Sequence, residues 1–271
     1  MDVMLFLKAI VLGLVEGITE FLPISSTGHL ILVGDLLGFD DETAKVFEIF
    51  IQLGAILAVV WLYREKVLAT LKGLPANKEA RSLAMNVMIA FLPAAVVGLL
   101  THSYIKAHLF NPITVAGALI AGGIAILVIE RMDHRSHVKT VETITMKQAL
   151  ATGFAQCLSL FPGVSRSGAT IMGGLVIGFD RRVAVDFSFF LAIPTMFAAT
   201  LYELVKNFHS LSSSDIPLFA VGFVVAFFSA LVVIKAFLGF VARHDFKGFA
   251  YYRIVFGLLV LAFYWQRGWK F

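Results

Sequence analysis

Residues 16–29 read EGITEFLPISSTGH and lie in the middle of an apolar segment that extends over about residues 3–37. Two glutamates, a proline and a run of hydroxyl side chains interrupt this segment, which is otherwise as apolar as a membrane helix. A non-helical backbone is tolerated at membrane depth only where protein buries it or where it lines a wet cavity. We therefore predict a re-entrant helix hairpin, which enters and leaves the membrane on the same side.

A second interrupted segment, at about residues 148–178, contains FPGVSRSGAT at residues 161–170. When residues 8–61 are aligned without gaps on residues 148–201, 14 positions are identical, and they include the Gly-Phe-Asp runs at 38–40 and 178–180. The sequence thus predicts two related halves, at about 1–130 and 140–271. Paired interrupted segments at corresponding places in two halves point to a site between them.

The composition assigns the chain to a membrane. Hydrophobic residues make up 59% of the 271 residues and charged residues 15%, and the mean hydropathy is +0.88. A soluble domain has about 45–50% apolar and about 25% charged residues. An ordinary cytosolic enzyme, a disordered chain and a nucleic-acid-binding module are excluded, so no nucleic acid is expected as a partner. Cys157 is the single cysteine, which excludes an intrachain disulfide and a cysteine-based metal site.

Six uninterrupted apolar segments predict transmembrane helices, since a span takes about 20 mostly apolar residues. They lie at about 47–63, 85–100, 113–130, 185–205, 216–236 and 250–266. Each half then holds one hairpin and three spans, and because three is odd, the second half is inverted relative to the first. The predicted fold is one all-α polytopic membrane domain over residues 1–271, with an inverted repeat, six transmembrane helices and two re-entrant hairpins.

The basic residues predict an orientation. If both interrupted segments are hairpins, the loops at 64–84, 131–147, 179–184 and 235–249 share one side and hold 14 of the 22 Lys and Arg residues, whereas the other side holds five. The positive-inside rule makes the first side cytoplasmic and places both termini outside. The amino-terminal run MDVMLFLKAI has no basic region, so we expect no cleaved signal peptide.

The first hairpin carries two candidate catalytic carboxylates, Glu16 and Glu20, which are four residues apart and share one face of a helix. A charged side chain near the bilayer centre costs about 2.5–3.5 kcal/mol. We therefore expect a cation to hold the pair, either an arginine or a divalent metal.

The residues that follow the carboxylates suit an anion. Pro23 ends the helix, and Ser25, Ser26 and Thr27 offer hydroxyls and free N–H groups at the start of the next helix. Serine is also a preferred helix cap, so capping and anion contact remain alternative or joint roles. His29 follows within one turn and can transfer protons near neutral pH.

The second hairpin places Arg166 at the bend, between Ser165 and Ser167 and one turn before Thr170. A planar guanidinium beside hydroxyls at a helix start is typical of a phosphate clamp. No Walker loop is present, because GxxxxGK[ST] does not occur. Together the two hairpins suit a metal-bound phosphate or diphosphate at membrane depth.

EGITEFLPISSTGH and PGVSRSGAT resemble the two signature segments of the undecaprenyl-diphosphate phosphatase family, also called the bacitracin-resistance proteins, and FEIFIQLGAILAV and DFSFFLAIPTM fit as well. The resemblance implies removal of the terminal phosphate from undecaprenyl diphosphate, which recycles the carrier lipid for cell-wall synthesis. It also implies a divalent cation, Mg²⁺ or Ca²⁺, held by Glu16 and Glu20, and a site that opens to the external face of the bacterial cytoplasmic membrane. The implied catalytic residues are Glu16, Glu20, Ser26, His29 and Arg166.

Several alternatives remain open from the sequence. Ser26 is either the nucleophile, activated by His29, or a group that positions water. Arg253 either extends to the cytoplasmic headgroups or supports the site from below. The expected partners are a polyprenyl diphosphate and membrane lipid, and a homodimer is left open. A polyprenyl-phosphate flippase or other transporter is the competing function, because inverted repeats with broken helices are common in transporters.

Overall fold

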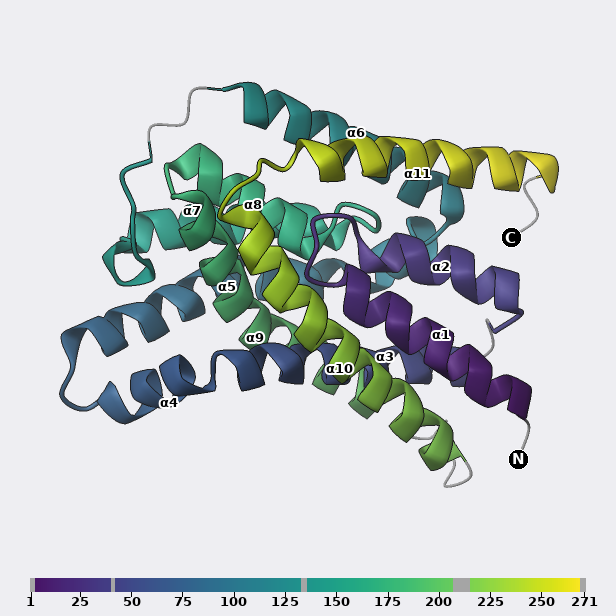
Figure 1. Cartoon of the computed structure of the whole chain (residues 1–271), viewed down its shortest axis with the longest axis horizontal. Helices are drawn as coiled ribbons and strands as arrows, with labels where there is room; N and C mark the ends of the chain where they lie inside the picture. The colour runs from purple at the N-terminus through teal and green to yellow at the C-terminus, as the bar shows by residue number, and fades with distance from the viewer. Residues whose placement is uncertain (1–2, 40–41, 133–135, 207–214, 269–271) are drawn as a thin grey trace.

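The computed structural model describes residues 3–39, 42–132, 136–206 and 215–268, and nearly all of them lie in helices (Figure 1). Two regions contain a shorter helix pair, α1 (Val3–Thr19) with α2 (Ser26–Leu37), and α7 (Met146–Cys157) with α8 (Arg166–Ile177). The other α-helices are α3 (Glu42–Leu62), α4 (Arg64–Gly73), α5 (Lys78–His108), α6 (Pro112–Arg131), α9 (Arg181–Lys206), α10 (Ile216–Val241) and α11 (Lys247–Gln266). Two 3₁₀ turns, η1 (Val141–Thr143) and η2 (Leu158–Leu160), complete these elements.

Five of the described helices, α5, α6, α9, α10 and α11, are long and apolar enough to cross a membrane. A sixth span results if α3 and α4 are counted together, although the chain bends by 73° between them. The prediction of an all-α, multi-pass membrane protein is confirmed. Each of the six predicted apolar segments falls within one helix or ends one residue beyond it.

The two helix pairs share their local geometry at the positions that the sequence repeat aligns. α2 and α8 have 12 residues each, and both end at a glycine in the left-handed region, Gly38 and Gly178. The amide of the next phenylalanine bonds back to Gly34 O in α2 and to Gly174 O in α8. This capping geometry closes the last turn of a helix and favours glycine at its end.

Tight helix contacts hold the first pair in place. α10 packs against both α1 and α3, α11 packs against α6, and α5 packs against α7. Gly13 of α1 lies so close to α10 that a Cβ atom at this position would be 2.6 Å from Gly222 O, and one at Gly17 would be 2.5 Å from Ala226 O. Glycine therefore permits a backbone approach that a larger residue would block.

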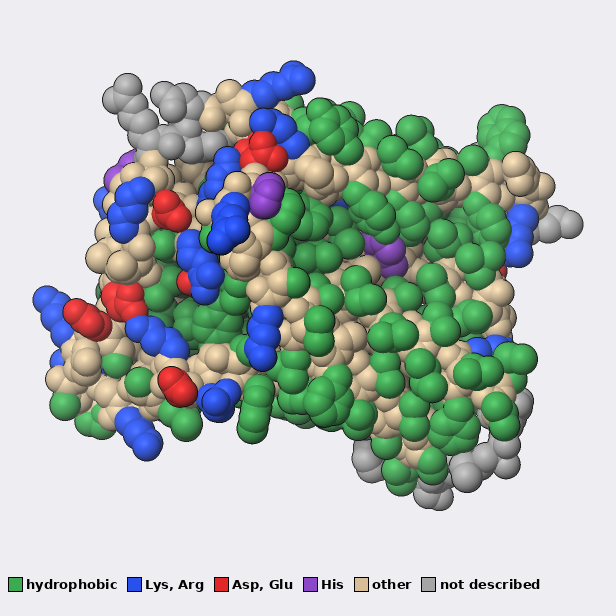
Figure 2. Space-filling model, viewed as in Figure 1, with side chains coloured by type: hydrophobic (Ala, Val, Ile, Leu, Met, Phe, Trp, Pro, Cys, Tyr) green, Lys and Arg blue, Asp and Glu red, His purple; other side chains and the backbone are tan. Residues whose placement is uncertain are grey.

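Charged side chains gather at one end of the molecule, around α4 and the starts of α7 and α11, whereas hydrophobic side chains cover most of the rest of the face in Figure 2. Lys66 pairs with Glu142 at this end, and Asp245 pairs with Lys247. The start of α1 and the end of α11 lie at the opposite end (Figure 1). A broad apolar surface of this kind needs lipid around it, because it is too extensive for a protein in water.

Candidate active site

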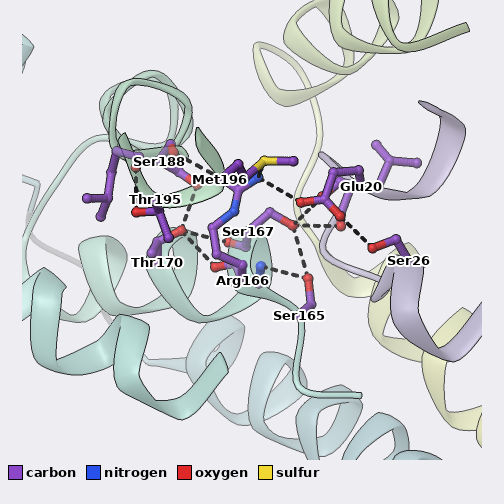
Figure 3. Close-up of polar contacts among 12 residues, drawn as sticks. Glu20, Ser26, Ser165, Arg166, Ser167, Thr170, Ser188, Thr195 and Met196 are labelled. Atoms are coloured by element: carbon purple, nitrogen blue, oxygen red, sulfur yellow. Dashed lines mark hydrogen bonds and ion pairs between the residues drawn. The ribbon is translucent and has the colours of Figure 1, made fainter. Parts of the chain in front are cut away.

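The bends of the two helix pairs lie against each other. We call residues 20–25 the first bend and residues 161–165 the second bend. Arg166, at the start of α8, places Nη2 3.1 Å from Oε1 of Glu20 in the first bend. Ser167 donates from Oγ to the carbonyl of Leu22 at 2.7 Å. Residues that are 146 and 145 positions apart in the sequence thus meet between the hairpins, one pair through its side chains and the other through a side chain and a main-chain carbonyl (Figure 3).

Both bends end in a strained serine. Ser25 has φ 70° and Ser165 has φ 79°, and no other non-glycine residue in the described ranges has a positive φ. Such a conformation costs about 1–3 kcal/mol and persists only where the surroundings enforce it. Ser165 accepts from Gly168 N at 3.0 Å and caps α8, whereas Ser25 makes no side-chain cap bond. Instead, the Ser25 carbonyl accepts from Nδ1 of His29 at 2.7 Å.

Glu20 connects the two hairpins. Its Oε1 faces Arg166, and its Oε2 accepts the hydroxyl of Ser26 at 2.5 Å (Figure 3). The side chains of Glu20 and Arg166 are about one-tenth exposed, so water screens their attraction only weakly. The hydroxyl of Ser26 therefore points at a carboxylate that a guanidinium also holds.

Glu16 lies one helical turn before Glu20, and the amide of Glu20 bonds to the carbonyl of Glu16 at 2.9 Å. Its side chain is fully buried, and neither carboxylate oxygen has a hydrogen-bond partner in the described part of the chain. Glu20 and Glu48 are the two carboxylates near enough to repel its charge. A buried, uncompensated carboxylate is costly, so this position calls for a cation.

The two carboxylates fit a divalent cation whose remaining ligands come from other oxygens. The described residues contain no group of three His, Cys, Asp or Glu side chains arranged to hold a metal ion. Mg²⁺ commonly binds to one or two carboxylates and completes its shell with water and phosphate oxygens. Glu16 and Glu20 supply the two carboxylates, and the unpartnered oxygens of Glu16 remain available for such an ion.

Arg166 is fixed by α9. Its Nη1 donates to Ser188 O at 3.2 Å, and its guanidinium carbon lies 5.5 Å from the ring centroid of Phe21. Thr170 donates to Arg166 O at 2.9 Å and lies 2.6 Å from the hydroxyl of Ser188 (Figure 3). The Nε of Arg166 is buried without a partner in the described chain, so one donor of the fork is left for a ligand.

Both ring nitrogens of His29 have partners other than Ser26. Its Nε2 lies 2.6 Å from the hydroxyl of Tyr252 in α11, and its ring stacks on Phe256 with centroids 4.1 Å apart. Since Nδ1 faces the Ser25 carbonyl, Nδ1 carries the proton and Nε2 accepts from Tyr252. Thr27 is half-buried in the first turn of α2.

Three polar residues in this part of the structure received no role from the sequence. Tyr252 lies in the run AYYRIVFG, where an aromatic residue gives no signal of a polar role. Ser188 supplies a carbonyl and a hydroxyl from the middle of an apolar helix. Gln156 is the repeat counterpart of Glu16, is fully buried, and leaves its Nε2 without a partner among the described residues. The repeat is the one signal that singles out Gln156, because it aligns an amide with a candidate catalytic carboxylate.

Known proteins resemble this chain over nearly its whole length. Residues 9–259 match the family model described as Bacitracin resistance protein BacA. A protein of Methylobacillus flagellatus named undecaprenyl-diphosphatase is 57% identical over 270 residues, which cover 98% of this chain and 100% of that protein. Proteins of the same name from Aromatoleum aromaticum and Nitrosomonas europaea are 55% and 56% identical, over 98% and 96% of this chain and 97% and 95% of their own lengths.

Proposed function

The chain belongs to the bacitracin resistance protein BacA family, and we propose that it hydrolyses undecaprenyl diphosphate to undecaprenyl phosphate and inorganic phosphate. The observation that carries this proposal is the meeting of the Glu16–Glu20 pair with Arg166 across two bends inside an apolar helix bundle. Carboxylates suit a metal, a guanidinium suits phosphate, and the surrounding apolar helices suit a polyprenyl chain.

Groups from both hairpins bind the diphosphate in this proposal. Arg166, with one free buried donor, and the N–H groups at the starts of α2 and α8 receive the phosphate oxygens. The hydroxyls of Ser25, Thr27, Ser165, Ser167 and Thr170 line the same two helix starts and orient the diphosphate. Glu16 and Glu20 would hold a divalent cation, which would supply Lewis-acid stabilisation of the charge on the transferred phosphoryl group.

In this proposal Glu20 accepts the proton of the attacking group, which is either the Ser26 hydroxyl or a water molecule. The Ser26 hydroxyl donates to Glu20, which supports a role of Glu20 as the acceptor of this proton or of the proton of a water molecule beside it. In one route Ser26 attacks the terminal phosphorus, releases undecaprenyl phosphate and is freed by water. In the other route Ser26 positions the attacking water. His29, held by Tyr252, supports the bend through the Ser25 carbonyl in either route.

The proposal includes a location. The charged end of the molecule carries the loops that the positive-inside rule makes cytoplasmic, which supports an external opening for the site in the bacterial inner membrane. The matching caps of α2 and α8, at aligned positions of the two halves, support the inverted repeat. This arrangement allows the substrate to enter from the outer leaflet.

Release of inorganic phosphate from undecaprenyl diphosphate by the protein in detergent tests the function. We expect the wild type to release phosphate and Glu20→Gln and Arg166→Ala to lose at least about 100-fold in kcat. Glu65→Gln, which changes a 92% exposed side chain in α4, is the matched control and should match the wild type. Detergent removes any gradient, so a pure transporter releases no phosphate. Full activity of Glu20→Gln or Arg166→Ala contradicts the assigned site.

A further inference from the structure

Arg253 of α11 is 1% exposed, so its side chain does not reach the headgroups. All five of its hydrogen bonds in the described chain go to main-chain carbonyls, at 2.9–3.3 Å. Nη1 donates to Pro23 O and Val164 O, Nη2 donates to Gly163 O and Ala118 O, and Nε donates to Leu119 O. One guanidinium therefore bonds to the first bend, the second bend and α6 together.

The surroundings of Arg253 are built to admit it. A Cβ atom at Gly122 of α6 would lie 2.1 Å from Nη2 of Arg253, so a residue without a side chain is needed there. Gly168 of α8 is almost as close, since a Cβ atom there would be 3.1 Å from Nη1. A buried guanidinium with only neutral acceptors is expensive, and five directed donors in a rigid fork are the property that distinguishes arginine here.

We propose that Arg253 is a positioning residue for the phosphatase reaction, because it locks the two bends together and so aligns Glu20 and Ser26 of one hairpin with Arg166 of the other. Three of the five carbonyls, those of Pro23, Gly163 and Val164, lie one or two residues before the strained serines that end the bends. This inference rests on the proposed function. Arg253 itself contacts backbone and acts on the substrate through the bends.

The first test is Arg253→Lys, which keeps the positive charge but removes the planar guanidinium and its five N–H donors. An ammonium has three donors without a fixed plane, so it serves fewer of the five carbonyls. We expect kcat to fall about 100-fold, the loss that a misplacement of about 1 Å causes, with a smaller change in KM. Arg267→Lys is the control, because Arg267 lies just after the same helix and pairs with Asp35 at 2.8 Å away from the bends. A wild-type kcat for Arg253→Lys overturns the proposal.

The second test leaves Arg253 in place and displaces its guanidinium. Gly122→Ala inserts a methyl group against Nη2, whereas Gly117→Ala, on the same helix, meets no atom within 4 Å. We expect Gly122→Ala to lower kcat and Gly117→Ala to keep it. If Arg253 only stabilised the fold, Gly122→Ala would lower the melting temperature and leave the kcat of the folded protein unchanged. That result contradicts a positioning role, even if Arg253→Lys fails to fold.

A distance measurement separates this inference from the proposed function. Spin labels at Ile18→Cys in α1 and Leu158→Cys in η2, both exposed and both just before a bend, report the spacing of the hairpins in a Cys157→Ala background. We expect a narrow distribution of distances in the labelled protein without a further change and in its Arg267→Lys control. In the Arg253→Lys and Gly122→Ala variants we expect a broader distribution. If the wild type released no phosphate, the proposed function would fail. The distance distribution would still show whether Arg253 holds the two bends together. If Arg253→Lys and Gly122→Ala both leave the distance distribution unchanged, the proposed role of Arg253 is overturned.

Discussion

Glu16→Gln provides the sharpest test of the cation site. Glu16 is fully buried, and both of its carboxylate oxygens lack a partner in the described chain, whereas Arg166 and Ser26 already hold Glu20. Glutamine keeps the shape and removes the charge. We therefore expect Glu16→Gln to raise the melting temperature relative to the wild type without a divalent cation, and to lower it when a divalent cation is bound.

The size of each effect follows from the environment of Glu16. Removing a charge from an apolar interior gains about 2.5–3.5 kcal/mol, but a buried, unbonded amide costs about 1–3 kcal/mol. The net gain without metal is about 1 kcal/mol, or about 2–4 °C in melting temperature. For the wild type, a cation at 100 times its Kd adds about 2.7 kcal/mol, or about 5–11 °C. Glu16→Gln should lose most of that increment.

Thermal unfolding in detergent, with EDTA or with Mg²⁺ or Ca²⁺, measures both effects. With EDTA the variant should melt above the wild type, and with saturating cation it should melt below it, so the order of the two melting temperatures reverses. Glu65→Gln, on the exposed face of α4, should follow the wild type under both conditions. A cation increment of wild-type size in Glu16→Gln would refute the assignment of Glu16 as a metal ligand.

Three further outcomes are expected. Glu20→Gln should bind inorganic phosphate in EDTA at least about tenfold more tightly than the wild type by calorimetry, because Arg166 no longer has a competing carboxylate worth about 1.5 kcal/mol. Ser26→Ala should lower kcat by about 100-fold or more, and mass spectrometry of stopped wild-type reactions should show a phosphoserine at Ser26 if the hydroxyl is the nucleophile. Gly178→Ala should destabilise the protein by about 1–2 kcal/mol at φ 99°, whereas Gly239→Ala, with no atom within 4 Å of a new Cβ, should stabilise it by about 0.4–1 kcal/mol.

The large features of the fold were predictable because they depend on long-range composition. Apolar length identified the spans, and proline, glycine and serine inside apolar segments identified both bends. The predicted span ends at residue 63, where the chain bends by 73°, but the predicted loop at 64–84 is wrong in part, because residues 64–73 form the helix α4. Asp40, which the repeat aligns with Asp180, lies outside the described residues.

The individual partners in the site were less predictable, because spacing along a helix defines a face but not the group opposite it. Glu16 and Glu20 share a face, yet in the described chain one is unpartnered and the other holds both Arg166 and Ser26. Arg253 bonds to carbonyls, which every residue carries, so its acceptors leave no mark in the sequence.

The pairing of Glu20 with Arg166 has a consequence for the order of events. While the ion pair is closed, the guanidinium that suits a phosphate is neutralised, and the carboxylate that suits the Ser26 proton is shared with a cation. In the proposed reaction an arriving diphosphate would compete with Glu20 for Arg166, so this ion pair must open before the guanidinium binds phosphate, while the hydrogen bond from Ser26 to Glu20 can persist.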